Sequence, residues 1–181
     1  MKLLSGRFIR CAVTVLVFGM ACGQAIADGE LKNGDFVQTW KMGDRVEEQL
    51  IPMYWFTSEP ETTGKPWVKV LNENQPGVEI TAGETSRFIF QDVKLDGSLT
   101  WTLKWISKGK GTATVDIYPR DDDGNIFQPV SRKVELTDEP HEEEMDVQMP
   151  AQTTILRIML APQPPDSIVN FEDIQLTSDL N

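Results

Sequence analysis

The chain has 181 residues and a formal net charge of −11 at pH 7, from 28 acidic and 17 basic side chains. A surface of this charge repels phosphate backbones and anionic lipid headgroups, which argues against nucleic acids and acidic membranes as partners. Neutral glycans remain compatible with it. The solubility of an exported protein would also account for the charge without any ligand.

Residues 1–27 have the composition of a secretory signal peptide. Three basic residues precede an apolar run over 11–22, and a small-x-small site ends at Ala27. The run is shorter than the roughly 20 residues of a membrane-spanning helix, and no later segment is long and apolar enough to be one. We therefore expect a secreted or periplasmic protein that begins at Asp28, with no membrane insertion. A lipid anchor on Cys22 is the alternative.

The remaining chain, 28–181, is predicted to be a single domain. Both cysteines lie in the leader, so the mature chain can form no disulfide and must be stabilised by burial of its core. Roughly 150 residues are enough for one domain to bury a self-sufficient core. Without the three basic residues of the leader, 14 basic and 28 acidic side chains remain, a net charge of −14.

The elements predicted in this domain are β-strands separated by turn residues, with no sustained helical period. In chain order the candidate strands are 53–57, 67–71, 78–81, 86–95, 99–107, 112–118, 131–136, 154–160 and 168–176. Gly and Pro punctuate the chain between them. Many short strands spaced in this way predict an all-β fold, an antiparallel β-sandwich of the jelly-roll type.

The clearest of these strands is 99–107, in which apolar and polar residues alternate. A period of two indicates one buried face, so Trp101 and Trp105 are expected in the core. Lys108-Gly109-Lys110-Gly111 supplies a turn signal, and 112–118 alternates in the same way. The two segments are therefore predicted to form a hairpin.

The opposite face of this hairpin would combine hydroxyl groups, both signs of charge and one aromatic ring. Its members are Thr100, Thr102 and Lys104 on one strand, Thr114, Asp116 and Tyr118 on the other, and Arg157 from a neighbouring strand. Such a composition suits a shallow glycan groove, which needs apolar walls and a few fixed polar groups. An ordinary solvated sheet face is the alternative interpretation.

Several short motifs occur in order along nearly the whole mature chain: Asn33-Gly34-Asp35-Phe36, Tyr54-Trp55, the segment 101–109, and Phe171-Glu172-Asp173-Ile174-Gln175-Leu176. As a set they resemble the family 4/9 carbohydrate-binding modules, which are galactose-binding-like jelly rolls. The resemblance implies non-catalytic binding of a poly- or oligosaccharide. It also implies stacking rings near strand or loop ends, for which Tyr54 and Trp67 are the leading candidates and Trp40 another, while Trp55 is expected inside.

Such modules often hold a structural calcium between the opening loop and the closing strand. The resemblance would place its ligands at Asp35 and Asp173, because calcium prefers oxygen donors. This chain has Val37 where the family has Glu, and Glu172 where it has the first Asp of the closing pair. The alternative is that Asn33 and Asp35 only bond backbone groups of a turn.

Catalysis is not expected. The sole histidine, His141, lies in the acidic run 139–146 with no partner His or Cys, and this run is predicted to be a solvated loop or an edge strand. The predicted ligand-binding set is therefore Tyr54, Trp67, Thr100, Lys104, Asp116, Tyr118 and Arg157. Two alternatives stay open: an exported structural or protein-interaction sandwich without sugar binding, and a small glycan-active hydrolase with two catalytic carboxylates.

Overall fold

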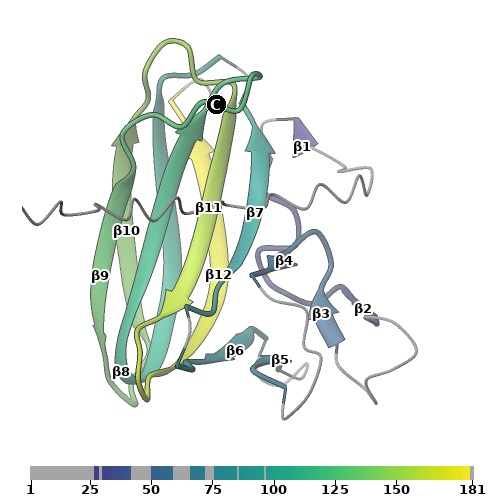
Figure 1. Ribbon diagram of the computed structural model, residues 1–181, viewed down its shortest axis with the longest axis vertical. Helices are drawn as coiled ribbons and strands as arrows, with labels where there is room; N and C mark the ends of the chain where they lie inside the picture. The colour runs from purple at the N-terminus through teal and green to yellow at the C-terminus, as the bar shows by residue number, and fades with distance from the viewer. Residues whose placement is uncertain are drawn as a thin grey trace, which may run out of the picture.

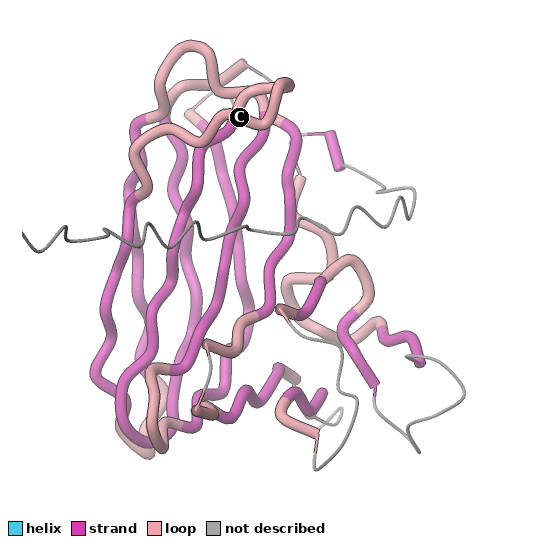
Figure 2. The backbone as a smooth tube through the Cα atoms, in the orientation of Figure 1, coloured by secondary structure: helices cyan, strands magenta, loops and turns pink. Residues whose placement is uncertain are grey.

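The structure, a computed structural model, describes residues 27–28, 30–41, 50–58, 66–71, 76–84, 86–95 and 97–179. The leader apart from Ala27, including the alternative anchor Cys22, lies outside the described residues. All the regular elements in the described part of the chain are β-strands (Figure 2). These described ranges contain no helix that is long and apolar enough to span a membrane.

The strands after residue 67 lie close to the predicted ones, whereas those over 27–28, 39–41 and 50–52 were not predicted, and the predicted strand 53–57 forms only at 56–57. In chain order the strands are β1 Ala27–Asp28, β2 Thr39–Lys41, β3 Leu50–Pro52, β4 Phe56–Thr57, β5 Val68–Val70, β6 Val78–Thr81, β7 Ile89–Lys94, β8 Thr100–Arg120, β9 Val130–Leu136, β10 His141–Gln148, β11 Ile155–Pro162 and β12 Ile168–Ser178. Most of the acidic run lies in the edge strand β10, so the second of its two predicted forms, an edge strand, is confirmed.

The largest difference from the sequence prediction is β8. It runs through 21 residues, so the predicted hairpin turn at Lys108-Gly109-Lys110-Gly111 is wrong. Gly109 and Gly111 adopt positive φ (143° and 87°), a conformation that favours glycine. A Cβ on Gly109 would lie 2.0 Å from the carbonyl oxygen of Ile168. These glycines let the strand continue where it passes close to the start of β12, instead of reversing it.

The two halves of β8 belong to two different layers of the sandwich. Its first half pairs with β10 and β12, and its second half pairs with β9 and β11. We call β1 and β4–β7–β11–β8–β9 sheet I, and β5–β6–β12–β8–β10 sheet II. All pairs are antiparallel except β1 with β7. Figure 1 shows the strands β9, β8, β11 and β7 of sheet I side by side, with β2 and β3 beside the sandwich.

The inward faces of the two sheets form one apolar core. In the first half of β8, Trp101, Leu103 and Trp105 are at most 1% exposed, which confirms the inward assignment of both tryptophans. Trp55 is also buried, as expected, and its ring lies 5.2 Å from that of Phe36. The alternation of buried and outward residues continues along β7, β8 and β11, so each sheet has one regular outer face.

The opening motif packs against the closing strand. Ile174 donates a backbone hydrogen bond of 2.9 Å to the carbonyl of Gly34, next to an irregularity in β12 between Glu172 and Gln175. The Asn33 side chain bonds the backbone of Gln38 and of Met53, and so fixes the loop. The sequence motifs at the two ends of the predicted domain therefore meet in space.

Candidate functional site

A cleft of about 400 Å³ lies on the outer face of sheet I. Its lining comes from β8, β11 and the segments around them: Ser86, Arg87, Phe88, Thr114, Asp116, Tyr118, Arg120, Ile126, Arg157, Met159, Ala161, Pro162, Gln163 and Pro164. The central strands of the sheet therefore supply most of the cleft.

The strand register places the outward side chains in and beside the cleft in rows across the sheet. Asp92, Arg157 and Tyr118 are register partners in one row. The next outward row, two residues along each strand, consists of Phe90, Met159 and Asp116. A charged row thus adjoins a row that is mostly apolar.

Arg157 is held in place from two sides. Its Nε and Nη2 donate to the two carboxylate oxygens of Asp92 at 2.7 and 2.8 Å, a bidentate pair. Its guanidinium also lies 4.1 Å from the centre of the Phe90 ring, within range for a cation–π contact. Asp92 is 9% exposed and Arg157 29%, so the pair is largely screened from water. These contacts fix the guanidinium of Arg157, a residue that lines the cleft.

Tyr118 and Asp116 follow each other on the outer face of β8. Asp116 accepts hydrogen bonds from the hydroxyls of Thr114 and Ser131. Burial raises the pKa of the Tyr118 phenol above its ordinary value, and the Asp116 carboxylate raises it further. The phenol therefore stays protonated at neutral pH. Its hydroxyl has no hydrogen bond to any described residue, so it is available to a ligand.

Aromatic side chains extend the apolar part of this face. The Phe90 ring stacks on Phe56 at 5.4 Å and contacts Phe88 at 6.2 Å. Phe88 and Met159 themselves line the cleft and are only partly buried. Sequence reasoning missed these residues. The sequence did contain a signal: residues 88, 89 and 90 are all apolar. A strand with one buried face needs apolar residues only at alternate positions, so some of these rings had to lie on the outer face.

The predicted ligand-binding residues are only partly brought together. Asp116, Tyr118 and Arg157 line the same cleft, and the expected adjacency of the Arg157 strand is confirmed by the register. Thr100 and Lys104 lie on sheet II instead, because the first half of β8 pairs with β10 and β12. The expectation that they stand beside Asp116 and Tyr118 is wrong for this reason.

The predicted stacking rings also differ in their surroundings. Trp67 is only 3% exposed, with the Arg87 guanidinium 5.7 Å from its ring centre, so the expectation of an open stacking face there is wrong. Tyr54 is 37% exposed and has a positive φ of 69°, rare for a large residue. Trp40 lies in β2, and its side chain is outside the described residues.

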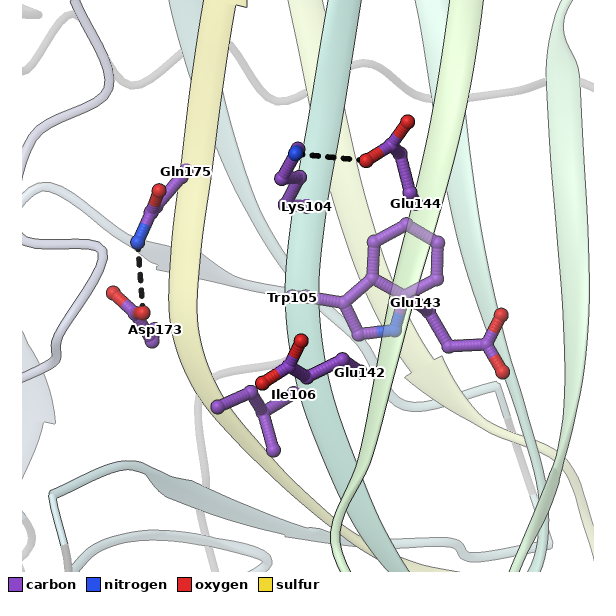
Figure 3. Close-up of a pocket in the computed structure, with 8 residues that line it drawn as sticks. All are labelled: Lys104, Trp105, Ile106, Glu142, Glu143, Glu144, Asp173 and Gln175. Carbon is purple, nitrogen blue, oxygen red and sulfur yellow. Dashed lines mark hydrogen bonds and ion pairs between the residues drawn. The ribbon is translucent and has the colours of Figure 1, made fainter.

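Lys104 lines a second cleft of about 390 Å³ on the outer face of sheet II (Figure 3). It forms an ion pair of 2.8 Å with Glu144, and this partner raises the pKa of the lysine. Across the cleft, Gln175 donates to Asp173 at 2.7 Å. The polar groups of this cleft mostly bind one another, whereas the first cleft leaves donors open.

Asp35 and Asp173 lie on the two segments that Gly34 and Ile174 join. Both are exposed; Asp35 accepts a bond of 3.3 Å from the Val37 backbone, and Asp173 accepts one from Gln175. Within the described ranges, no group of three or more Asp, Glu, His and Cys side chains could hold a metal ion. Calcium at this junction stays a prediction.

No protein-family model matches the chain, and no curated protein matches it in sequence. Solved structures do match it. A family 4 carbohydrate-binding module is 15% identical with a TM-score of 0.56, covering 81% of this chain and 98% of that one. A family 61 module in complex with β-1,4-galactotriose is 17% identical with a TM-score of 0.52, covering 83% and 99%.

A third match is the enzymatically active domain of tailspike protein 4 of bacteriophage CBA120, 12% identical with a TM-score of 0.57. It covers 70% of this chain but only 19% of the tailspike chain. At these identities the likeness concerns the fold. The chain is thus an all-β, antiparallel curled sheet with the β-sandwich fold of carbohydrate-binding modules.

Proposed function

We propose that the protein binds a poly- or oligosaccharide, without catalysis, in the cleft on the outer face of sheet I. The observation that carries this proposal is the combination of apolar surface with fixed polar groups in one cleft. Phe88 and Met159 offer apolar contact, and Arg157 offers a rigid, preorganised donor. Sugar rings have apolar C–H faces and a rim of hydroxyls, so they need both kinds of surface.

Two further facts support the proposal. One structural neighbour with the same fold was solved with β-1,4-galactotriose bound. Tyr118 lines the cleft, its hydroxyl has no hydrogen bond to any described residue, and a sugar hydroxyl could satisfy it. Because residues 1–27 have the composition of a signal peptide, we propose a secreted or periplasmic location for this binding.

The direct test is a glycan array probed with the purified protein, followed by calorimetry on the glycans that bind. Tyr118→Phe keeps the ring and removes one hydroxyl, so affinity should fall about two- to tenfold, the range of a single neutral hydrogen bond. Lys69→Gln is the control, because Lys69 is exposed on β5 of sheet II and should leave affinity unchanged. An array on which nothing binds would refute the proposal.

A further inference from the structure

Arg120 lines the proposed glycan cleft, and its guanidinium has few partners within the protein. Its side chain is 24% exposed, so most of it is removed from water. Among the described residues its side-chain nitrogens donate no hydrogen bond, and its Nε is buried without an acceptor. A guanidinium has five N–H donors, and leaving them unpaired in a partly buried place is costly.

The acidic groups around Arg120 are already engaged elsewhere. Its ion-pair contact is with Asp92 Oδ2 at 3.6 Å, an oxygen that also accepts from Arg157 at 2.8 Å. Asp121 binds Asn125 within the turn after β8, and Asp122 accepts from Thr154. The ion-pair partner of Arg120 is therefore shared with Arg157, and at 3.6 Å it accepts no hydrogen bond from Arg120.

The cleft as a whole also differs in charge from the rest of the chain. Arg87, Arg120 and Arg157 line it, against Asp116 in the lining and Asp92 behind Arg157. Three cations face two anions, whereas the whole chain has a net charge of −11. A concave surface with low-dielectric walls concentrates the field of such a local excess.

We infer that the ligand is an acidic glycan, and that Arg120 binds the carboxylate of a uronic acid residue. This inference rests on the proposed function and names its substrate class. The planar guanidinium fork matches a carboxylate in a bidentate geometry that a single hydroxyl cannot reproduce. Tyr118 lies two residues earlier on the same face of β8, and its hydroxyl could bond a hydroxyl of the same or the next sugar.

The experiment compares uronate oligosaccharides with their own neutral counterparts. Oligogalacturonates and alginate oligomers are tested by calorimetry beside the same oligomers after reduction of each carboxyl group to an alcohol. A uronate should bind at least about tenfold more tightly than its reduced form, as expected for hydrogen bonds to a charged group. The difference should shrink as salt is raised.

Substitutions locate the carboxylate. Arg120→Gln should bring the affinity for the uronate down to that of the reduced sugar, and Arg120→Lys should keep part of the preference, because charge remains without the fork. Lys133→Gln removes one positive charge from the same sheet outside the cleft lining, and should keep the full preference. Near-ultraviolet circular dichroism establishes that each variant is folded; if Arg120→Gln is not, Arg120→Lys still provides the test.

The outcomes separate this inference from the proposed function. Equal affinities for the uronate and its reduced form would overturn the acidic class and leave glycan binding standing. A preference that persists in Arg120→Gln would overturn the assignment to Arg120. Binding of neither form, together with an empty array, would overturn the inference and the proposed function at once.

Discussion

Gly34 and Ile174 lie so close together that a Cβ on Gly34 would sit 2.0 Å from the carbonyl oxygen of Ile174. The same two residues share a backbone hydrogen bond of 2.9 Å from Ile174 to Gly34. The glycine of the opening motif is thus required by the approach of another backbone, from a strand about 140 positions later in the chain. The two motifs are linked physically, and this contact fixes the opening loop on sheet II.

Gly34→Ala should therefore destabilise the fold, because the neighbouring atom is backbone and cannot move aside. We expect a loss of about 3 kcal/mol in the free energy of unfolding, the upper part of the overpacking range. Gly97→Ala is the matched control. Gly97 has no atom within 4 Å of its added Cβ but has a positive φ of 97°, so it should cost only about 1–2 kcal/mol. Urea unfolding measures both, and equal costs would contradict the steric account.

Trp67 and Tyr54 should respond differently to substitution. Trp67→Ala empties part of the core and should cost about 3–5 kcal/mol. Tyr54→Gly removes an exposed side chain and relieves an unfavourable φ, so the free energy of unfolding should stay within about 1 kcal/mol of the original value. Chemical denaturation distinguishes them. A loss of several kcal/mol in Tyr54→Gly would mean that its ring packs more tightly than its exposure indicates.

The Asp92–Arg157 pair should contribute measurably to stability. Asp92→Asn leaves the Arg157 guanidinium without its counter-ion while both are largely screened from water. We expect a cost of about 2 kcal/mol, below the range for fully buried pairs because Arg157 keeps partial contact with solvent. Glu135→Gln, in an exposed pair with Lys133, is the control and should change stability little. Similar effects of the two substitutions would show that Asp92 is not specially placed.

Tyr118 should titrate above its ordinary pKa of 10.0, because burial and then the Asp116 carboxylate raise it. A raised pKa in the folded state means that folding favours the protonated phenol. The resulting stability is fully present below pH 10 and is lost as the pH rises through the folded pKa. The chain has two tyrosines, so Tyr54→Phe leaves Tyr118 as the only one to be followed by tyrosinate absorbance. The same midpoint in native and urea-unfolded protein would disprove the shift.

Alternation along the sequence predicted most of the strands after residue 67, the inward tryptophans and the fold class, because burial of one sheet face imposes a period of two. The short strands β1, β2 and β3 carry no such alternation and were not predicted. It could not show whether Gly109 and Gly111 turn the chain or carry it from one sheet to the other. That choice depends on the close approach of Ile168, which is distant in sequence. For this reason the sequence prediction wrongly grouped Lys104 with Tyr118 and Arg157. The register places Arg157 beside Tyr118 in sheet I, whereas Lys104 lies in sheet II.

The predicted calcium site can be tested without knowledge of any glycan. An ion held by Asp35 and Asp173 would join two segments that already meet through Gly34 and Ile174, so calcium should raise the melting temperature. Asp173→Asn should remove this increase, since an amide oxygen is a weaker ligand than a carboxylate. Asp123→Asn removes the same charge in the exposed turn after β8, and should keep the increase intact. Differential scanning calorimetry in calcium and in chelator gives the answer, and identical melting temperatures would rule out a stabilising ion at this junction.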